Sequence, residues 1–340
     1  MQILNAKEFM VLAKSFPLVD VRSPAEFEEG HISGAINIPI FNDDERAIVG
    51  TIYKNNGRLS AIERGLEIVG PKMAQFAHKA IEIASFNRLL VYCWRGGMRS
   101  ENMAWLFERV GINCSVLQGG YKSYRNYLLE MTGNLPQLIV IEGYTGSGKT
   151  EILLHLKAMG EQVIDLEGLA NHKGSVFGGI GQEMQPTTQQ FQNDLFDEIL
   201  NFDLLKRIWI EGESLTVGRV FLPDPLWVRM NEAKCIEIFV PKADRIRRLV
   251  TEYGSLPYDL MESAIETISK RLGNLRIQEI LHCYQEKNLD CVAGKLLEYY
   301  DQTYLYSREK YKKKLTGIVL PNNDASANAA IILEKTANLF

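Results

Sequence analysis

The sequence has few cysteines, no long hydrophobic run and no excess of basic charge. Its five cysteines are scattered and none belongs to a C-x-x-C pair, so we expect reduced thiols and no structural zinc. No stretch approaches the roughly 20 consecutive apolar residues of a membrane span, and the first residues do not resemble a signal peptide. The formal net charge of −4 gives no bulk attraction to nucleic acid, so RNA contact would need local basic patches. These absences predict a cytoplasmic protein with no membrane partner.

The 340 residues instead alternate apolar strands with amphipathic helices, as in parallel α/β sheets. "FPLVDVRS", "RLLVYCW" and "NCSVLQGG" are predicted strands of a first unit, and "LIVIE" opens a second unit. Between them, "MTGNLPQ" is polar and contains one Gly and one Pro. We therefore expect one α/β domain over 1–130, a linker over 131–137, and a second α/β domain over 138–340 that is largely helical from about Pro241.

The second unit opens with a glycine-rich phosphate-binding motif. "GYTGSGKT", residues 143–150, matches G-x-x-x-x-G-K-[ST] in full, between an apolar strand and a helical segment. Glycines let backbone N–H groups approach phosphate oxygens, and the helix N-terminus adds partial positive charge. The motif predicts a polyphosphate site with Thr150 as a magnesium ligand, but it does not distinguish nucleotides from other diphosphates. The expected phosphate-binding residues are Gly143, Thr145, Gly146, Ser147, Gly148, Lys149 and Thr150.

Two later segments carry further candidates for this site. "RIWIEGES" offers Glu211 or Glu213 as a second carboxylate for the metal, although either could be an ordinary strand-end carboxylate. "DLEGLANHKGSVFGG", residues 165–179, concentrates charged residues and glycines in an expected loop. That composition suits substrate contact, and loop scaffolding is the alternative reading. The candidates there are Asp165, Glu167, His172 and Lys173.

In the first unit, "VYCWRGGMRS" at residues 91–100 places a cysteine where a strand meets a glycine turn. The backbone N–H groups around Gly96 and Gly97 can converge into an anion-binding nest, with Arg95 and Arg99 adding charge. Such surroundings favour the thiolate, the form that attacks. Cys93 is then either this nucleophile or a buried thiol, whereas Cys114 and Cys235 resemble small core residues. The catalytic candidates are Cys93, Arg95, Gly96, Gly97 and Arg99.

The first unit resembles rhodanese-type sulfurtransferase domains. "LVDVRSPAEFEEGHISGAINIP", residues 18–39, is similar to their opening signature, and "VYCWRGGMRS" and "LQGGYKSYR" to their active-site and closing segments. The resemblance gives Asp20, Arg22 and His31 structural roles and gives the cysteine a transferable chalcogen. Many small rhodaneses have four residues between cysteine and arginine, whereas five separate Cys93 from Arg99. That is the loop length of dual-specificity phosphatases, and it leaves room for a tetrahedral anion.

The two units together resemble the tRNA 2-selenouridine synthase family over nearly the whole chain, helped by "NDDERAIVGTIYKNNG" and "WIEGESLTVGRVFLP". The resemblance implies a rhodanese-like parallel-sheet domain followed by a P-loop NTPase-like α/β domain with a mostly helical C-terminal part. It implies that wobble 2-thiouridine of tRNA becomes 2-selenouridine, by geranylation with geranyl diphosphate and then selenation with selenophosphate through Cys93. A selenophosphate synthetase is a candidate partner, and Mg²⁺ a candidate cofactor.

Basic clusters in the helical part are candidates for binding the tRNA. Three arginines lie close together on a predicted helix, and a lysine run follows a tyrosine-rich segment. Such clusters can meet RNA phosphates, while Tyr304, Tyr306 and Tyr311 could stack on bases. Solvated helix faces are the alternative for any one residue. The candidates are Arg245, Arg247, Arg248, Lys312, Lys313 and Lys314.

Two other functions are compatible with these motifs. The loop length also suits a cysteine phosphatase or sulfurtransferase with a regulatory nucleotide-binding P-loop domain, although we identify no general acid near the loop. A non-catalytic rhodanese-like module on a P-loop ATPase or kinase is the second alternative. The intact cysteine argues against it, because a module without catalysis has no need of the thiol.

Overall fold

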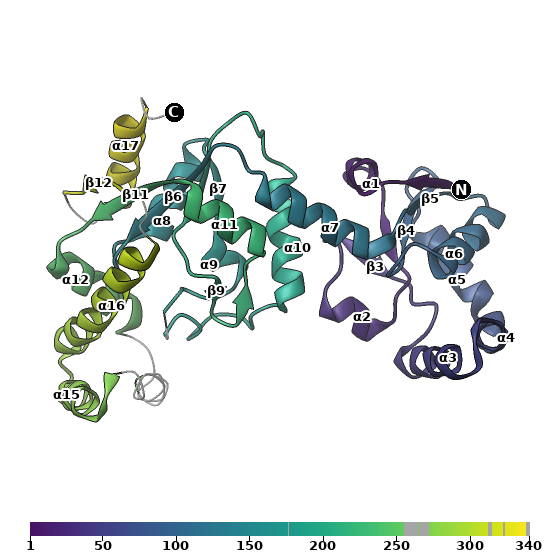
Figure 1. Cartoon of the computed structure of the whole chain (residues 1–340), viewed down its shortest axis with the longest axis horizontal. Helices are drawn as coiled ribbons and strands as arrows, with labels where there is room; N and C mark the ends of the chain where they lie inside the picture. The colour runs from purple at the N-terminus through teal and green to yellow at the C-terminus, as the bar shows by residue number, and fades with distance from the viewer. Residues whose placement is uncertain (176, 255–264, 266–271, 312–314, 322–323, 338–340) are drawn as a thin grey trace. The chain divides into compact units, whose positions relative to one another are not determined.

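The computed structural model describes all residues except 176, 255–264, 266–271, 312–314, 322–323 and 338–340, drawn in grey in Figure 1. The chain forms two compact units, Met1–Met131 and Thr132–Phe340. Residues 131–133, the first three of the expected linker, are helical, because α7 (Gly120–Gly133) continues through them. No helix among the described residues is both long enough and apolar enough to cross a membrane.

The first unit is a five-stranded parallel sheet with the strand order β1-β5-β4-β2-β3. Asparagine or serine side chains cap several of its helices: Asn5, Ser23 and Asn42 each form a capping box with a glutamate three residues later. Val91 of the central strand, Phe76 of α5 and Phe107 of α6 belong to one buried cluster. The strands are β1 (Gln2–Leu4), β2 (Leu18–Asp20), β3 (Ala35–Asn37), β4 (Arg88–Tyr92) and β5 (Asn113–Leu117); the helices before α7 are α1 (Ala6–Ala13), α2 (Pro24–Glu29), α3 (Asp43–Asn56), α4 (Arg58–Val69), the 3-10 turn η1 (Gly70–Lys72), α5 (Met73–Ile83) and α6 (Met98–Arg109).

The second unit contains another five-stranded parallel sheet, with the order β12-β11-β6-β8-β7, and a two-stranded antiparallel ribbon of β9 and β10. Its later part is largely helical (Figure 1). The strands are β6 (Leu138–Gly143), β7 (Gln162–Ile164), β8 (Ile208–Glu211), β9 (Thr216–Val217), β10 (Val220–Phe221), β11 (Lys234–Phe239) and β12 (Leu315–Val319); the helices are α8 (Lys149–Ala158), α9 (Leu166–Leu169), α10 (Thr188–Ile199), α11 (Asp224–Glu232), α12 (Lys242–Tyr253), α15 (Asn274–Gln285), α16 (Leu289–Tyr311) and α17 (Ala325–Thr336).

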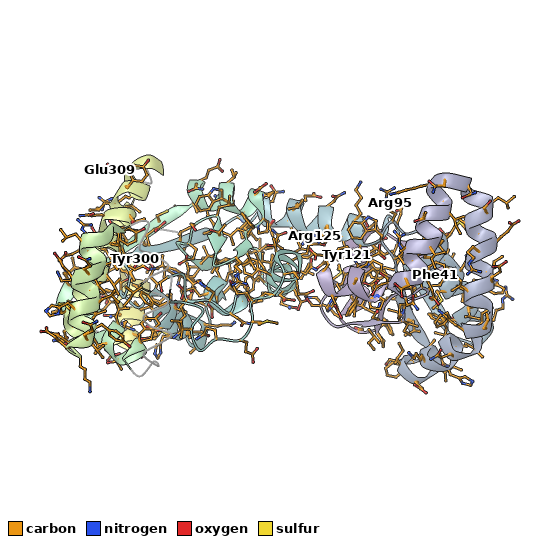
Figure 2. The ribbon with its side chains drawn as sticks, turned by 90° about the horizontal axis from the view of Figure 1, so that it is seen from below. Phe41, Arg95, Tyr121, Arg125, Tyr300 and Glu309 are labelled. Carbon is orange, nitrogen blue, oxygen red and sulfur yellow. A yellow bond between two sulfur atoms is a disulfide. The ribbon has the colours of Figure 1, made fainter. Side chains whose placement is uncertain are left out.

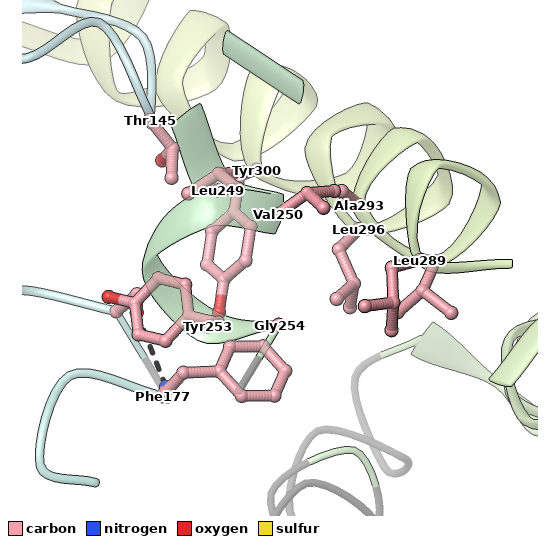
Figure 3. A pocket seen from close by; sticks show the side chains of 12 residues that line it. Thr145, Phe177, Leu249, Val250, Tyr253, Gly254, Leu289, Ala293, Leu296 and Tyr300 are labelled. Atoms are coloured by element: carbon pink, nitrogen blue, oxygen red, sulfur yellow. Dashed lines mark hydrogen bonds between the residues drawn. The ribbon is translucent and has the colours of Figure 1, made fainter. Parts of the chain in front are cut away.

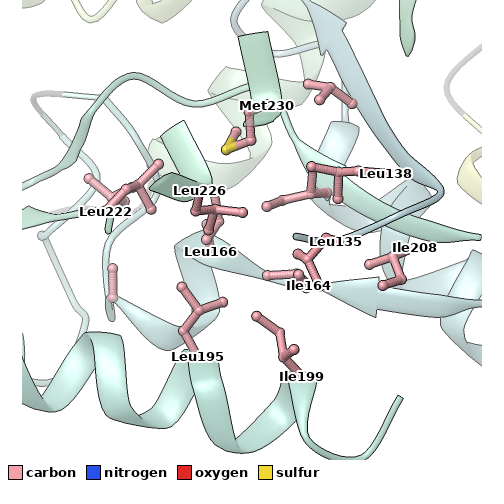
Figure 4. Close-up of a cluster of buried hydrophobic side chains, with 14 of the residues drawn as sticks. Leu135, Leu138, Ile164, Leu166, Leu195, Ile199, Ile208, Leu222, Leu226 and Met230 are labelled. Carbon is pink, nitrogen blue, oxygen red and sulfur yellow. The ribbon is translucent and has the colours of Figure 1, made fainter. Parts of the chain in front are cut away.

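Both faces of this second sheet are buried, as the continuous apolar run of β6 predicts. Leu138 and Val140 lie in a cluster with residues of α10 and α11, among them Leu195 and Leu226 (Figure 4). The alternate residues Ile139 and Ile141 belong to a separate cluster with side chains of α8 and α17. The helices therefore sandwich the sheet and fix the end of β6, where the glycine motif begins.

The expectation that all cysteines are free thiols is wrong for two of the five. Cys283 of α15 and Cys291 of α16 form a disulfide, with their Cα atoms 5.9 Å apart. The two helices turn back on each other, so residues eight positions apart come face to face, a pairing that scattered spacing does not reveal. Cys93, Cys114 and Cys235 are free and buried.

Candidate functional site

The cysteine loop follows β4, the central strand of the first sheet, and ends where α6 begins. Gly96 has φ +60°, and a Cβ there would lie 2.4 Å from the Leu117 carbonyl and 2.6 Å from the backbone nitrogens of Gly119 and Gly120. Only glycine permits both this conformation and this close approach. The turn after β5, "QGG", therefore packs directly against the cysteine loop.

The Cys93 thiol is buried and contacts a hydroxyl. Its Sγ lies 3.2 Å from Oγ of Ser100, whose hydroxyl also lies 3.1 Å from the Gly97 carbonyl. The hydroxyl can therefore donate either to that carbonyl or to a thiolate. The backbone is fixed as well, since the N–H of Tyr121 donates to the Cys93 carbonyl at 2.8 Å. Ser100 is a site residue that the sequence reasoning missed, although it directly follows Arg99.

The two arginines of the loop have different surroundings. Arg99 donates to Oε2 of Glu26 at 2.8 Å, and Arg46 lies 3.5 Å from the same carboxylate. Burial tends to raise the pKa of Glu26, but Arg99 and Arg46 outweigh it and lower that pKa. Arg95 is exposed at the surface of its unit (Figure 2) and makes no hydrogen bond or ion pair with any described residue. Of the two loop arginines, Arg95 is thus the one whose guanidinium is not paired with a described residue.

A buried arginine, Arg22, packs against an aromatic ring of the cysteine loop. Arg22 is fully buried, donates to both carboxylate oxygens of Asp20 at 2.6 and 3.0 Å, and donates to the Gly30 carbonyl. Its guanidinium lies 4.1 Å from the Tyr121 ring centroid and 5.7 Å from that of Trp94. His31 stacks on Phe27 with ring centroids 3.7 Å apart. These contacts agree with structural roles for Asp20, Arg22 and His31.

The phosphate loop follows β6, the central strand of the second sheet, and leads into α8. Gly146 and Gly148 both have φ +76°, a conformation that favours glycine. Lys149, the first residue of α8, donates from Nζ to the Gly143 carbonyl at 3.1 Å. Ser147 Oγ is buried and has no hydrogen-bond partner among the described residues. The loop therefore has the conformation that the motif predicts, with its lysine folded over it.

Carboxylates from two segments meet beside Thr150. Its hydroxyl donates to Oε2 of Glu167 at 2.8 Å, and the Glu167 N–H donates to Oε2 of Glu211 at 3.1 Å. A Cβ on Gly174 would lie 2.6 Å from a Glu167 oxygen and 3.1 Å from a Glu213 oxygen, so these two carboxylates are neighbours. Asp165 instead accepts from the Gly168 N–H and caps α9. Of the candidates in the two segments, Glu167, Glu211 and Glu213 thus come together.

This acidic group suits a hard cation. Burial raises the pKa of Glu211 well above its ordinary value, and Glu167, Asp165 and Glu213 add to the effect. Burial also raises the pKa of Glu167, although Lys149 opposes the shift. Glu211 Oε1 is buried and has no hydrogen-bond partner in the described part of the chain. The described residues contain no group of three or more His, Cys, Asp or Glu side chains placed to hold a metal. Magnesium beside phosphates needs only one or two carboxylates, so Thr150, Glu167 and Glu211 fit it.

His172 and Lys173 lie at the edge of this group. Burial, then Arg219, lowers the pKa of His172. Lys173 forms an ion pair with Glu252 of α12, and its Nζ lies 5.9 Å from the Tyr253 ring centroid. Lys173 therefore ties the loop after β7 to α12, and its charge is already compensated.

The three arginines expected to contact tRNA occupy three different environments. Arg245 is only 5% exposed, forms a bidentate pair with Asp301 at 2.8 Å and donates to the Thr145 carbonyl. That burial contradicts an RNA contact: Arg245 supports the phosphate loop. Arg248 pairs with Glu151, and its guanidinium lies beside Gly148. Arg247 is exposed and pairs with Asp244. Lys312, Lys313 and Lys314 lie outside the described residues.

Comparison with known proteins covers both units. A family model described as the tRNA 2-selenouridine synthase AAA domain matches residues 136–328, and a rhodanese-like domain model matches residues 5–127. A tRNA 2-selenouridine synthase from Bdellovibrio bacteriovorus is 34% identical over 346 aligned residues, which cover 87% of this chain and 90% of the relative. Synthases of the same name are 35% identical in Nitrosomonas europaea, covering 82% of this chain and 74% of the relative, and 34% identical in a Sulfurovum species, covering 90% and 92%.

Proposed function

The chain belongs to the tRNA 2-selenouridine synthase family, and from this premise we propose that it is a transferase that converts wobble 2-thiouridine of tRNA into 2-selenouridine. A cysteine phosphatase or sulfurtransferase with a regulatory nucleotide-binding domain is not favoured, since the similar synthases align across both units. The synthase function implies a selenophosphate-type substrate. We propose geranyl diphosphate as the second substrate, tRNA in the cytoplasm as the acceptor, and a selenophosphate synthetase as the source of selenophosphate.

An apolar cleft beside the phosphate loop is the observation that carries the prenyl diphosphate proposal. Thr145 of the loop lines it together with Leu249 of α12 and Leu296 of α16, and Phe177 and Tyr253 close one side (Figure 3). Nearly all of its lining atoms are apolar. A nucleoside would bury its donors and acceptors there without partners, at a cost of about 1–3 kcal/mol for each group. The cleft has a volume of about 50 Å³ and is open to solvent, so it would hold part of a hydrocarbon chain attached to a diphosphate, and that part would gain roughly 25 cal/mol for each Å² buried.

In the first proposed step, sulfur of 2-thiouridine attacks the first carbon of the geranyl chain. The carbon–oxygen bond to diphosphate breaks, and the N3 proton of the base passes to water. Lys149 and the N–H groups of the loop would bind the departing diphosphate, where charge develops. Magnesium on Thr150, Glu167 and Glu211 would supply additional charge stabilisation. The reaction turns a thiocarbonyl, which is a poor leaving group, into a thioether whose geranylthiolate can leave readily in the second step.

In the second proposed step, the thiolate of Cys93 attacks the phosphorus of selenophosphate, which Arg95 and the loop N–H groups hold. The phosphorus–selenium bond breaks, a sulfur–phosphorus bond forms, and hydrogen selenide is released. Selenium then attacks carbon 2 of the base, geranylthiolate leaves, and water cleaves the phosphocysteine. This route balances without an oxidant, whereas a perselenide formed on Cys93 from selenophosphate would need one. The five-residue loop, with Ser100 beside the thiol, suits a tetrahedral anion.

Nucleoside mass spectrometry tests the proposal. Transfer RNA containing 2-thiouridine is incubated with the protein, Mg²⁺ and geranyl diphosphate, and selenophosphate is added to half of the sample. We expect S-geranyl-2-thiouridine in one half and 2-selenouridine in the other. If neither nucleoside forms, the tRNA-modification proposal is wrong. Rapid ATP turnover in place of geranylation would contradict the prenyl diphosphate assignment alone.

A further inference from the structure

A second cavity in the Thr132–Phe340 unit has a different character from the apolar cleft. Its volume is about 300 Å³, and both carboxylates and aromatic rings line it. Its walls come from the end of β6, the segment after β8, α11, α16 and the start of β12. The lining residues that matter below are Glu142, Glu213, Thr216, Trp227, Tyr304 and Arg308.

This cavity shares residues and contacts with the phosphate site. Glu142 directly precedes Gly143, the first residue of the phosphate motif. The Tyr304 ring lies 4.8 Å, centroid to centroid, from the ring of Tyr144 in the phosphate loop. On the other side, the Glu213 carboxylate neighbours that of Glu167, which accepts from Thr150. A molecule in the cavity would therefore lie next to the bound diphosphate.

The chemistry of the lining selects the class of ligand. Glu142 is only 5% exposed, and with Glu213 it makes the interior unfavourable for an anion and favourable for hydrogen-bond donors. Burial, then Glu142 and Glu237, raises the pKa of Tyr304, so its phenol stays neutral. Arg308 is 41% exposed at the rim, where it and Tyr304 both donate to Glu237. A neutral ring that carries hydrogen-bond donors suits the interior, and a phosphate suits the rim near Arg308.

The size of the cavity agrees with this chemistry. A volume of 300 Å³ is at the lower end of the range for small-molecule sites. A base with its ribose is of this size, whereas a stacked pair of bases is larger. Enzymes that modify a base take it out of the stack and hold it in a closed pocket, against aromatic and polar side chains. Trp227 and Tyr304 supply the aromatic side chains, and Thr216 supplies a hydroxyl.

We propose that this cavity binds the target pyrimidine nucleoside of the RNA, turned out of its stack, with its N3–H donating to a glutamate carboxylate. This inference rests on the proposed function and adds the place of the acceptor. The apolar cleft and the nucleoside cavity then adjoin the phosphate loop, where the bond to diphosphate breaks.

Photo-crosslinking on the unchanged protein is the first test. The probe is an anticodon stem-loop RNA with 4-thiouridine at the wobble position, and crosslinked peptides are mapped by mass spectrometry. We expect crosslinks to residues 212–216, Trp227 or 304–308. Crosslinks that map only elsewhere, while the protein still modifies 2-thiouridine RNA, would overturn this inference and leave the proposed function intact. If the RNA neither crosslinks nor is modified, both fail.

A cavity-filling variant is the second test. Thr216→Phe should raise the KM for RNA at least tenfold and remove the crosslink, because the larger ring occupies the nucleoside volume. The thermal shift produced by geranyl diphosphate should stay unchanged. The matched control is Thr303→Phe, at an exposed position on α16 outside the cavity lining. Normal RNA modification by a folded Thr216→Phe protein would overturn the inference; if that variant does not fold, the crosslink map decides.

Discussion

The cysteine loop and the phosphate loop are built alike in several respects. Each follows the central strand of a five-stranded parallel sheet and leads into a helix, and each contains glycines with positive φ. Each is also supported by a buried arginine that pairs with an aspartate and lies against an aromatic ring of the loop. Arg22 pairs with Asp20 and lies 5.7 Å from the Trp94 ring, and Arg245 pairs with Asp301 and lies 5.0 Å from the Tyr144 ring.

The charges around the two loops differ. The cysteine loop has a nucleophile at its start, and its exposed Arg95 has no ion-pair partner among the described residues. The phosphate loop has no cysteine, and Glu167, Glu211 and Glu213 crowd beside Thr150. One backbone design can thus serve covalent attack in one unit and electrostatic binding of a metal diphosphate in the other. Substitutions in each loop should therefore affect different steps.

The largest expected effect is at the nucleophile. Cys93→Ala should reduce 2-selenouridine formation to background while S-geranyl-2-thiouridine still accumulates, because only the second step uses the thiol. The matched control is Cys114→Ala in the same sheet, since burial and Glu108 raise the pKa of Cys114 to about 12 and keep it protonated. Nucleoside mass spectrometry measures both products. Selenation at the normal rate by the Cys93 variant would contradict the assignment of covalent attack to the cysteine loop.

The second-largest expected effect is at the lysine of the phosphate loop. Lys149→Ala should slow geranylation by about 10²–10³-fold, the range for losing one preorganised electrostatic contact. Selenation of RNA that already carries S-geranyl-2-thiouridine should be unaffected. Lys157→Ala is the control on the same helix, at an exposed lysine whose partner is Glu198. If Lys149→Ala lowers both activities equally, the two loops do not act separately.

Replacing the buried arginine beside each loop should destabilise the two units by different amounts. Arg22→Met leaves Asp20 buried without its partner and should destabilise the first unit by about 3 kcal/mol. Arg245→Met should cost the second unit less, because the Asp301 side chain is 22% exposed and water can solvate it. Arg247→Met, at an exposed arginine, serves as the control. Hydrogen exchange resolved by unit measures each effect, and equal losses from both variants would contradict the comparison.

The sequence predicted those features that local patterns encode. Alternating strands and helices gave both parallel sheets, and glycines at fixed spacings gave both loops, since a loop conformation depends on nearby residues. The comparisons confirm the family and its two domain types. The assignment of individual site residues stays a prediction that the variants above test.

Local sequence patterns could not predict the features that depend on long-range packing. Glu26 lies 73 positions from Arg99, and the Cys283–Cys291 pair needs two helices to fold back on each other. Arg245 was assigned to RNA because three arginines cluster in sequence. Its i, i+4 relation to Leu249 puts it on the apolar face of α12, and this periodicity could have predicted its burial. Nothing local joins Trp227 to Tyr304, so the nucleoside cavity appears only in three dimensions.

The smallest expected effect tests whether the ion pair with Glu26 holds Arg99, the second arginine of the cysteine loop, in place. Burial raises the pKa of Glu26, but the nearby charge of Arg99 lowers it by more, so the pKa of Glu26 lies below the ordinary 4.5. Ionised Glu26 therefore stabilises the fold above about pH 4.5, and this contribution is lost as the pH falls through the lowered pKa. The unchanged protein should lose more stability between pH 7 and 3 than Glu26→Gln, by less than about 1 kcal/mol because the pair is partly exposed. Denaturant melts of the first unit at each pH measure this, with Glu67→Gln at an exposed pair as the control. Parallel curves for the unchanged protein and Glu26→Gln would mean that Arg99 is not held by Glu26 and is free, like Arg95, to bind the anion.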